Sequence, residues 1–111
     1  MEEPLPQPKT IEVLVLNDHL GSIAVLAKSL ADENRLRILL CVSEGKKSVS
    51  QIVEELNLSQ SLVSHHLKEL KRTLLVSVER RGPFVDYEIA DGKINDILIR
   101  LGELAVELLS K

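Results

Sequence analysis

The chain has 111 residues, 44% of them hydrophobic and 28% charged, and a formal net charge of −3. This length accommodates one domain, and the aliphatic content is too high for a disordered chain. The single cysteine, Cys41, excludes a disulfide within the chain and a zinc site with several thiolates, which favours a reducing compartment. The only aromatic side chains, Phe84 and Tyr87, are too few for a surface that stacks several bases.

The N-terminal segment differs in composition from the rest. Residues 1–9 are acidic and contain three of the four prolines, so we expect a disordered lead-in there, unlike a basic secretory leader or an Arg-rich transit peptide. The apolar run at 11–30 approaches the length of a membrane span, but five polar or charged side chains interrupt it. We therefore expect no membrane span, a cytoplasmic protein, and a single domain at 10–111.

Aliphatic spacing predicts a succession of helices in the first two thirds of the chain. The segment 11–16 is short and β-branched, which leaves helix and strand equally open. Helical spacing is clear from His19 to Ala31. Three further helices are predicted with N-caps at Asp32, at Ser48 or Ser50, and at Ser59, ending at Gly45, at Asn57 and near Arg72.

The period changes after the fourth of these helices. Residues 75–79 and 84–89 alternate like two strands, with Gly82-Pro83 at the turn between them. A last helix is predicted from about Gly92 to Leu109. Its apolar face consists of Ile94, Ile97, Leu98, Leu101, Leu104, Ala105 and Leu108.

The charges are unevenly distributed along the chain. Residues 46–81 carry 7 basic and 4 acidic side chains, whereas the segments on either side are each net negative by three. A local positive patch of this kind can meet phosphate while the rest of the molecule repels it. Charge alone favours an ordinary solvated face, so the pattern around the patch decides.

Two short helices joined by the turn at 56–59, followed by a strand hairpin, form the winged helix-turn-helix that docks on duplex DNA. The predicted fold class is therefore mainly α with a small β-hairpin wing. The second helix carries one polar stripe opposite its leucines, and short polar side chains let a helix approach base edges closely. We expect DNA contacts from Ser59, Gln60, Ser61, Ser64, His65, Lys68, Arg80 and Arg81, with Lys68 and the two arginines mainly holding phosphate.

Two other chemistry-bearing residues favour structural roles. His66 falls in the apolar sector of the same helix, which predicts a buried, hydrogen-bonded imidazole rather than a ligand. Cys41 lies among Leu39, Leu40 and Val42, which predicts a buried, inert thiol.

At these residues the sequence resembles the ArsR-type winged-helix transcriptional repressors. The resemblance covers about 60 residues and is carried by three runs: Leu30-Ala-Asp-Glu-Asn-Arg-Leu-Arg-Ile-Leu-Leu40, Leu58-Ser-Gln-Ser-Leu-Val-Ser-His-His-Leu-Lys-Glu-Leu70 and Arg80-Arg-Gly-Pro-Phe-Val-Asp-Tyr-Glu-Ile89. It implies a homodimer built on the first and last helices, which represses an operon until a signal releases it.

Three departures from the family pattern modify that expectation. Ser48-Val49-Ser50 stands where metal-sensing members have Cys-x-Cys, and no histidine follows His66, so neither usual metal site is expected. Leu74 stands where the family usually has glycine, which predicts a tighter or differently closed helix end.

The residues and the resemblance together predict a sequence-specific regulator of double-stranded DNA, a dimeric repressor on a palindromic operator, with no cofactor or metal and with its effector undetermined. The alternative is a winged-helix protein-interaction module whose basic patch is incidental. An enzyme has little support, because Ser64, His65 and Glu69 share one helix without a predicted pocket, oxyanion donors or phosphate loop.

Overall fold

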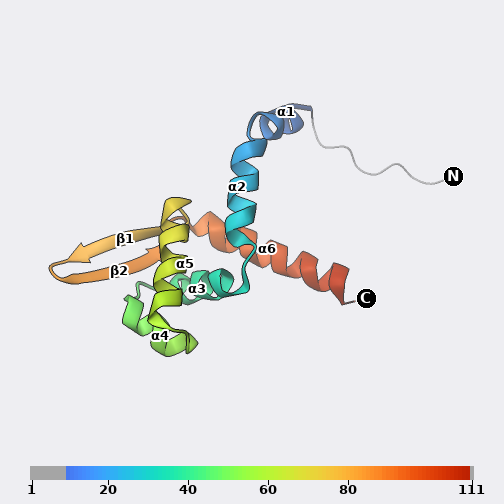
Figure 1. Ribbon diagram of the computed structural model, residues 1–111. Helices are drawn as coiled ribbons and strands as arrows, with labels where there is room; N and C mark the ends of the chain where they lie inside the picture. Colours follow the sequence, from blue (N-terminus) through green and yellow to red (C-terminus); the bar gives the residue numbers. More distant parts are fainter. Residues whose placement is uncertain (1–9, 111) are drawn as a thin grey trace.

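The structure is a computed structural model that describes residues 10–110, so the lead-in predicted at 1–9 lies outside the described residues. These residues form a helical molecule with one hairpin projecting from it (Figure 1). The elements are α1 (Thr10–Asp18), α2 (Leu20–Leu30), α3 (Glu33–Ser43), α4 (Val49–Leu56), α5 (Gln60–Arg72), β1 (Val76–Arg81), β2 (Phe84–Ile89) and α6 (Gly92–Leu109). The predicted fold class is confirmed, and the undecided segment at 11–16 is helical.

The predicted caps set the starts of the central helices. Asp32 accepts a hydrogen bond from the backbone N–H of Arg35 at 3.1 Å. Ser48, rather than Ser50, caps α4, and it forms a reciprocal capping box with Gln51. Ser59 caps α5 by accepting a hydrogen bond from the backbone N–H of Leu62, without a reciprocal partner. The starts of both helices of the helix-turn-helix are therefore fixed by hydrogen bonds within their own first turns.

The C-terminal end of α5 closes as it would with a glycine at position 74, although this residue is a leucine. Leu74 adopts the left-handed conformation with φ of 63°, as a glycine would. The N–H of Leu75 bonds the carbonyl of Leu70 at 2.9 Å, and the N–H of Leu74 bonds the carbonyl of Lys71 at 3.0 Å. This is a Schellman motif, with Leu75 and Leu70 both buried beside it. The predicted tighter or different closure is wrong: the usual motif forms despite the strained leucine.

The wing is an antiparallel hairpin in which Val76 pairs with Ile89 and Arg81 with Phe84. The first strand begins one residue later than predicted, because the N–H of Leu75 belongs to the end of α5. The base of the hairpin is tied to the segment before α4, since Lys47 and Tyr87 exchange both backbone hydrogen bonds, at 3.0 and 2.8 Å.

One hydrophobic core lies between α3, α4, α5 and the base of the wing. Its side chains come from the apolar faces of these elements, and α5 contributes a face opposite its polar stripe. The buried members are Ile38, Leu39, Cys41, Val42, Ile52, Val63, Leu67, Leu70, Leu75 and Val76. Residues 33–89, which hold this core, are called the winged unit below.

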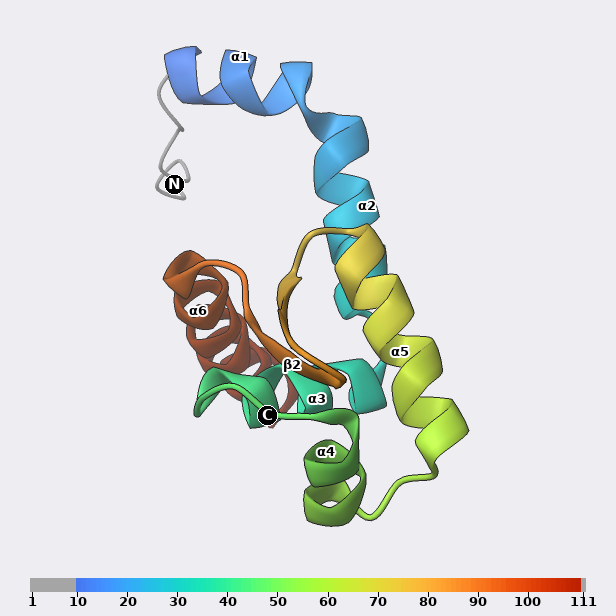
Figure 2. The same cartoon turned by 90° about the vertical axis from the view of Figure 1, so that its left-hand side faces the viewer.

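The helices outside the winged unit are barely buried. No residue of α6 is buried and only Ser29 is buried in α2. Figures 1 and 2 show α1 and the N-terminal part of α2 projecting from the central helices, and Figure 1 shows the C-terminal half of α6 extending beyond them. The radius of gyration is accordingly 17.1 Å, against about 13 Å for a compact chain of this length.

Among residues 10–110, no single helix is long and apolar enough to cross a membrane. Only α1 and α2 taken together, as a pair bent by 74°, reach that length and composition.

Candidate nucleic-acid interface

The polar stripe of α5 faces away from the core. Because Val63, Leu67 and Leu70 face the core on the opposite side of this helix, the positions of the stripe are left in solvent. All the predicted contact residues of the stripe are exposed, namely Gln60, Ser61, Ser64, His65 and Lys68. The helix therefore presents a continuous row of short donors and acceptors, with one cation toward its C-terminal end.

Ser59 differs from the other predicted contacts because its hydroxyl is already used. Its Oγ accepts a hydrogen bond from the backbone N–H of Leu62 at 3.2 Å, and it lies 3.5 Å from the Oγ of Ser61. The hydroxyl that caps α5 thus sits at the edge of the exposed stripe, where its second lone pair and its proton remain available.

The two predicted arginines of the wing are not equivalent. Arg81 donates from Nε and Nη2 to Oδ2 of Asp86, at 3.0 and 2.5 Å, and the carboxylate is largely buried. Arg80 is exposed and has no ion pair among the described residues. Arg80 is therefore the uncompensated cation of the wing, and the Arg81–Asp86 pair braces the hairpin.

A polar network beneath the stripe was missed by the sequence reading except for its histidine. His66 is buried, as predicted, and accepts a hydrogen bond at Nδ1 from Arg35 over 3.4 Å. Its Nε2 faces Asp32 at 3.7 Å. Burial lowers the pKa of His66 against the opposing effect of Asp32, while the backbone hydrogen bond from Arg35 lowers the pKa of Asp32.

Arg35 also joins α2 to α5, since it bonds His66 of α5 and two carbonyls of α2. Arg35 donates from Nε to the carbonyl of Ser29 at 2.6 Å and from Nη2 to that of Lys28 at 3.3 Å. A second link is the buried pair of hydroxyls of Ser29 and Thr73, 3.0 Å apart. Arg35 lies three residues into the helix capped by Asp32, and only the spatial meeting of α2, α3 and α5 gives it this role.

Cys41 is buried, as predicted, and its thiol donates to Oε2 of Glu55 at 3.0 Å. Lys47 holds the same carboxylate through Nζ at 2.5 Å. Burial and the hydrogen bond to Glu55 raise the pKa of the thiol to about 11. A thiol with such a pKa is a poor nucleophile and a poor metal ligand at neutral pH.

Ser48, which stands where metal-sensing members of the family have a cysteine, has a structural role in this fold. The hydroxyl of Ser48 accepts the N–H of Gln51 at 3.2 Å and is committed to the start of α4. Within residues 10–110, no three side chains of histidine, cysteine, aspartate or glutamate gather into a group that could hold a metal ion.

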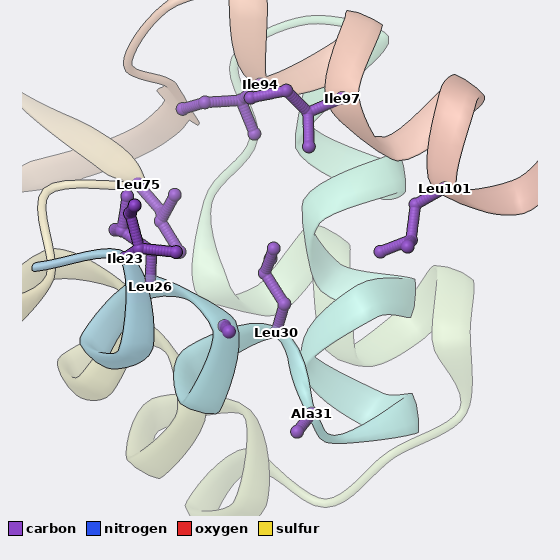
Figure 3. A pocket seen from close by; sticks show the side chains of 9 residues that line it. Ile23, Leu26, Leu30, Ala31, Leu75, Ile94, Ile97 and Leu101 are labelled. Carbon is purple, nitrogen blue, oxygen red and sulfur yellow. The ribbon is translucent and has the colours of Figure 1, made fainter. Parts of the chain in front are cut away.

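An apolar groove separates α2 from α6. Figure 3 shows side chains of the two helices pointing toward this space, with Leu75 at its edge. The groove has a volume of about 570 Å³, and its lining consists of Ile23, Leu26, Ala27, Leu30, Ala31, Leu75, Ile94, Ile97 and Leu101. A second apolar groove of about 280 Å³ lies between α3 and α6. Both grooves border α6.

Residues 32–78 match the family described as bacterial regulatory protein, arsR family. The HTH-type transcriptional repressor SmtB of Mycobacterium tuberculosis is 34% identical over 96 residues, which cover 86% of this chain and 65% of SmtB. The transcriptional activator HlyU of Vibrio cholerae is 34% identical over 80 residues, which cover 72% of this chain and 74% of HlyU.

Solved structures agree with these sequence matches. The structure of HlyU from Vibrio cholerae superposes with a TM-score of 0.69 at 31% identity, covering 78% of this chain and 94% of HlyU. A homodimeric winged helix-turn-helix DNA-binding domain from Mycobacterium bovis gives a TM-score of 0.74 at 26% identity, covering 96% of this chain and 94% of that domain. The family match lies on the helix-turn-helix that presents the polar stripe, and the chain belongs to the ArsR family of bacterial regulatory proteins.

Proposed function

We propose that this chain is a sequence-specific, double-stranded DNA-binding transcriptional regulator that acts as a homodimer on a palindromic operator. The observation that carries the proposal is the exposed stripe of α5 together with the uncompensated Arg80 on the adjoining wing. A helix of this kind enters the major groove, while a cation on the hairpin reaches phosphate beside it.

The division of labour within this surface follows from side-chain chemistry. Gln60, Ser61, Ser64 and His65 have donors and acceptors on short side chains and read base edges. Lys68 and Arg80 hold phosphates, because Lys68 lies toward the C-terminal end of the stripe and Arg80 lies on the wing, beside the groove-facing positions. Arg81 contributes a weaker phosphate contact, since Asp86 already balances its charge.

The uncovered apolar surface supports the dimer. Large side chains that are about half exposed gather on α1, α2 and α6, far more than an isolated small protein normally leaves in water. They are Leu14, Val15, Leu16, Leu20, Ile23, Val25, Leu26, Ile97, Ile99, Leu101, Leu104, Val106, Leu108 and Leu109. A two-fold pairing through these helices places two α5 helices on one face, which matches a palindromic site.

The direction of regulation is proposed as repression. SmtB is named as a repressor and HlyU as an activator, so family membership permits either sign. A winged helix-turn-helix dimer acts most simply by occupying promoter DNA. The signal that releases the DNA is a separate question. The hydroxyl of Ser48 is used in the cap of α4 and the pKa of Cys41 is raised, which supports a signal other than a thiophilic metal ion. Titration of the operator complex with zinc, copper(I) and arsenite tests this: stoichiometric release by any of them contradicts it.

The test of DNA reading is selection of bound duplexes from a random pool, followed by variants at two positions. Gln60→Ala is expected to alter the preference at one base position by about 1 to 3 kcal/mol. Arg80→Gln is expected to weaken binding to all sequences alike and to lower the salt slope by about one.

The matched controls are Glu107→Ala and Lys93→Gln, two exposed positions on α6 away from the stripe and the wing. If Gln60→Ala and Arg80→Gln produce the same sequence-independent loss, the division of roles is wrong. If no duplex is enriched and binding to random DNA shows no salt dependence, the protein-interaction alternative replaces the proposal.

A further inference from the structure

A polar pocket lies beside the DNA-reading stripe of α5 and shares His65 with it. It opens where the C-terminal half of α2 meets the C-terminal half of α5, two segments that lie next to each other in Figure 2 and are joined by the Ser29–Thr73 hydroxyl pair. Its volume is about 400 Å³, and its lining consists of Val25, Lys28, Ser29, Arg35, His65, Glu69 and Arg72. It is unlike the apolar grooves beside α6, since all but one of its lining residues have polar side chains.

The pocket is positively charged in a chain whose net charge is −3. Lys28, Arg35 and Arg72 face one carboxylate, that of Glu69, so the formal charge of the lining is +2 before His65 is considered. A pocket of about 390 Å³ on the opposite side of α3 has Glu44, Glu55 and one cation, Arg37, in its lining, so its lining is net negative. Positive lining charge is thus a property of the recognition-helix side and does not extend around the molecule.

The three cations have different amounts of unused hydrogen-bonding capacity. Arg35 spends its donors on the carbonyls of Ser29 and Lys28 and on His66, so it supplies charge at the floor of the pocket. Arg72 donates through Nε and Nη2 to the same Oε2 of Glu69, at 3.2 and 2.9 Å. This fixes the guanidinium and leaves Nη1 for another acceptor.

Lys28 is the least engaged of the three. It is exposed on α2, and its Nζ has no ion pair within the described part of the chain. Its ammonium and the Nη1 of Arg72 come from different helices, with the ring of His65 lining the same space. The site therefore offers an ammonium, a guanidinium edge and an imidazole over a floor that is itself cationic.

We propose that this pocket binds a phosphate group, bridging Lys28 of α2 and Arg72 of α5. A tetrahedral oxyanion suits these donors, since guanidinium and ammonium groups form charge-assisted hydrogen bonds to its oxygens. The phosphate comes either from the DNA backbone beside α5, in which case the inference rests on the proposed function, or from a free small molecule bearing a phosphate. Either source fastens α2, a helix of the uncovered apolar surface, to the helix that reads DNA.

The first arm of the test uses the DNA-free protein. Inorganic phosphate and pyrophosphate are titrated while amide and imidazole resonances are followed, with sodium chloride at matched ionic strength as the reference. Binding at the pocket is expected to give saturable shifts confined to residues 25–29 and 65–72. Lys28→Gln with Arg72→Gln is expected to weaken the binding at least about tenfold.

The second arm measures duplex affinity against salt concentration. If the phosphate belongs to DNA, the Lys28→Gln, Arg72→Gln protein is expected to lose about one unit of salt slope, since each neutralised phosphate contributes about 0.9. The matched control is Lys93→Gln with Arg37→Gln. Arg37 is a solvent-exposed arginine paired with Glu33 one turn away, as Arg72 is paired with Glu69. Sedimentation checks that both double variants keep the wild-type assembly state.

Each outcome decides the proposal. Saturable shifts without a slope change identify a free phosphate ligand, and a slope change without such shifts identifies the DNA backbone. If the shifts are absent and both double variants keep the wild-type slope, the pocket is not a phosphate site. If the wild-type protein binds no duplex, the proposed function fails, whereas the first arm still tests the pocket.

Discussion

The winged unit and the helices that flank it satisfy their apolar side chains in opposite ways. Within 33–89, the leucines, isoleucines and valines of three helices and a hairpin converge on one core, and seven of these side chains are less than 2% exposed. In α6, residues with the same chemistry and a regular helical period leave no position buried. Apolar periodicity alone therefore does not say whether the covering surface lies in the same chain.

The difference shows which part of the molecule is complete. The winged unit contains a core made entirely of its own residues, so a single chain can fold it. The flanking helices touch that core mainly through Leu30, Ile94 and Leu98, which are partly buried. Their remaining surface reaches its lowest free energy only against a second protein surface. Folding of the winged unit and assembly of the dimer are thus separable.

The largest effect is expected from breaking the core of the winged unit. Leu67 is 1% exposed and lies on α5 opposite the polar stripe. Leu67→Ala is expected to lower the free energy of unfolding by about 2 to 5 kcal/mol, through lost burial and the cavity that remains. Urea unfolding measures it. Leu74→Ala, at a position that is 78% exposed, is the control and is expected to change stability by less than about 0.5 kcal/mol.

The second effect concerns the flanking helices alone. Leu101→Asp with Leu108→Asp puts two charges on the uncovered face of α6 and is expected to raise the dimer Kd more than about 100-fold, equivalent to about 2.7 kcal/mol. DNA affinity falls with it, while the cooperative unfolding of the winged unit persists. Sedimentation velocity gives the assembly state, and Lys93→Asp at the start of α6 is the control. A wild-type protein that is monomeric at micromolar concentration would end the dimer proposal.

The third prediction separates the two regions by pH. Burial lowers the pKa of His66 below the value near 6.5 that it has in the unfolded chain. The unfolded state therefore binds the proton more readily, and the stability that depends on neutral His66 is complete above about pH 6.5 and is lost as the pH falls toward the folded-state pKa. The slope cannot exceed about 1.4 kcal/mol per pH unit for one proton.

Unfolding measured between pH 5 and 8 tests this. His66→Gln is expected to remove the slope, and His65→Gln, at the exposed neighbour, to leave it in place. An unchanged slope in His66→Gln would assign it to another group. The monomeric α6 variant is expected to show the same slope as wild type, because His66 belongs to the winged unit.

The smallest effect is a gain. Leu74 holds a left-handed conformation that costs a leucine about 1 to 2 kcal/mol and glycine almost nothing. Since the side chain is exposed, Leu74→Gly is expected to stabilise the winged unit by about 1 kcal/mol, partly offset by the greater freedom of glycine in the unfolded chain. Thermal unfolding measures the gain, with Leu109→Gly at the end of α6 as the control. A loss of stability at Leu74→Gly would show that the leucine makes contacts of its own.

The sequence predicted best what depends on neighbours along the chain. The caps at Asp32 and Ser59 could be predicted, and that of α4 narrowed to Ser48 or Ser50, because cap and first turn lie within three residues of each other. The helical period of α5 placed His66 in the core and the stripe in solvent. Residues 11–16 stayed undecided, since a short β-branched segment carries no period that separates helix from strand.

The side-chain contacts that could not be predicted from the sequence join residues that are far apart along the chain or on different strands. The links from Arg35 to His66 and from Ser29 to Thr73 join positions 31 and 44 residues apart, and no local pattern marks them. The Arg81–Asp86 pair spans the hairpin and separates two adjacent arginines that looked alike. The reading roles assigned to Gln60, Ser61, Ser64 and His65 remain predictions.

The two backbone hydrogen bonds between Lys47 and Tyr87 hold the wing against the segment before α4, and this limits the spacing of DNA contacts that one protomer can make. With the hairpin fastened to the residue just before α4, the reach from the N-terminus of α5 to the tip at Gly82 is a fixed length. In the proposed complex with DNA, a protomer then measures a constant number of base pairs between groove contact and wing contact. Operator half-sites that differ in this interval are distinguished by geometry, even when every contacted base is the same.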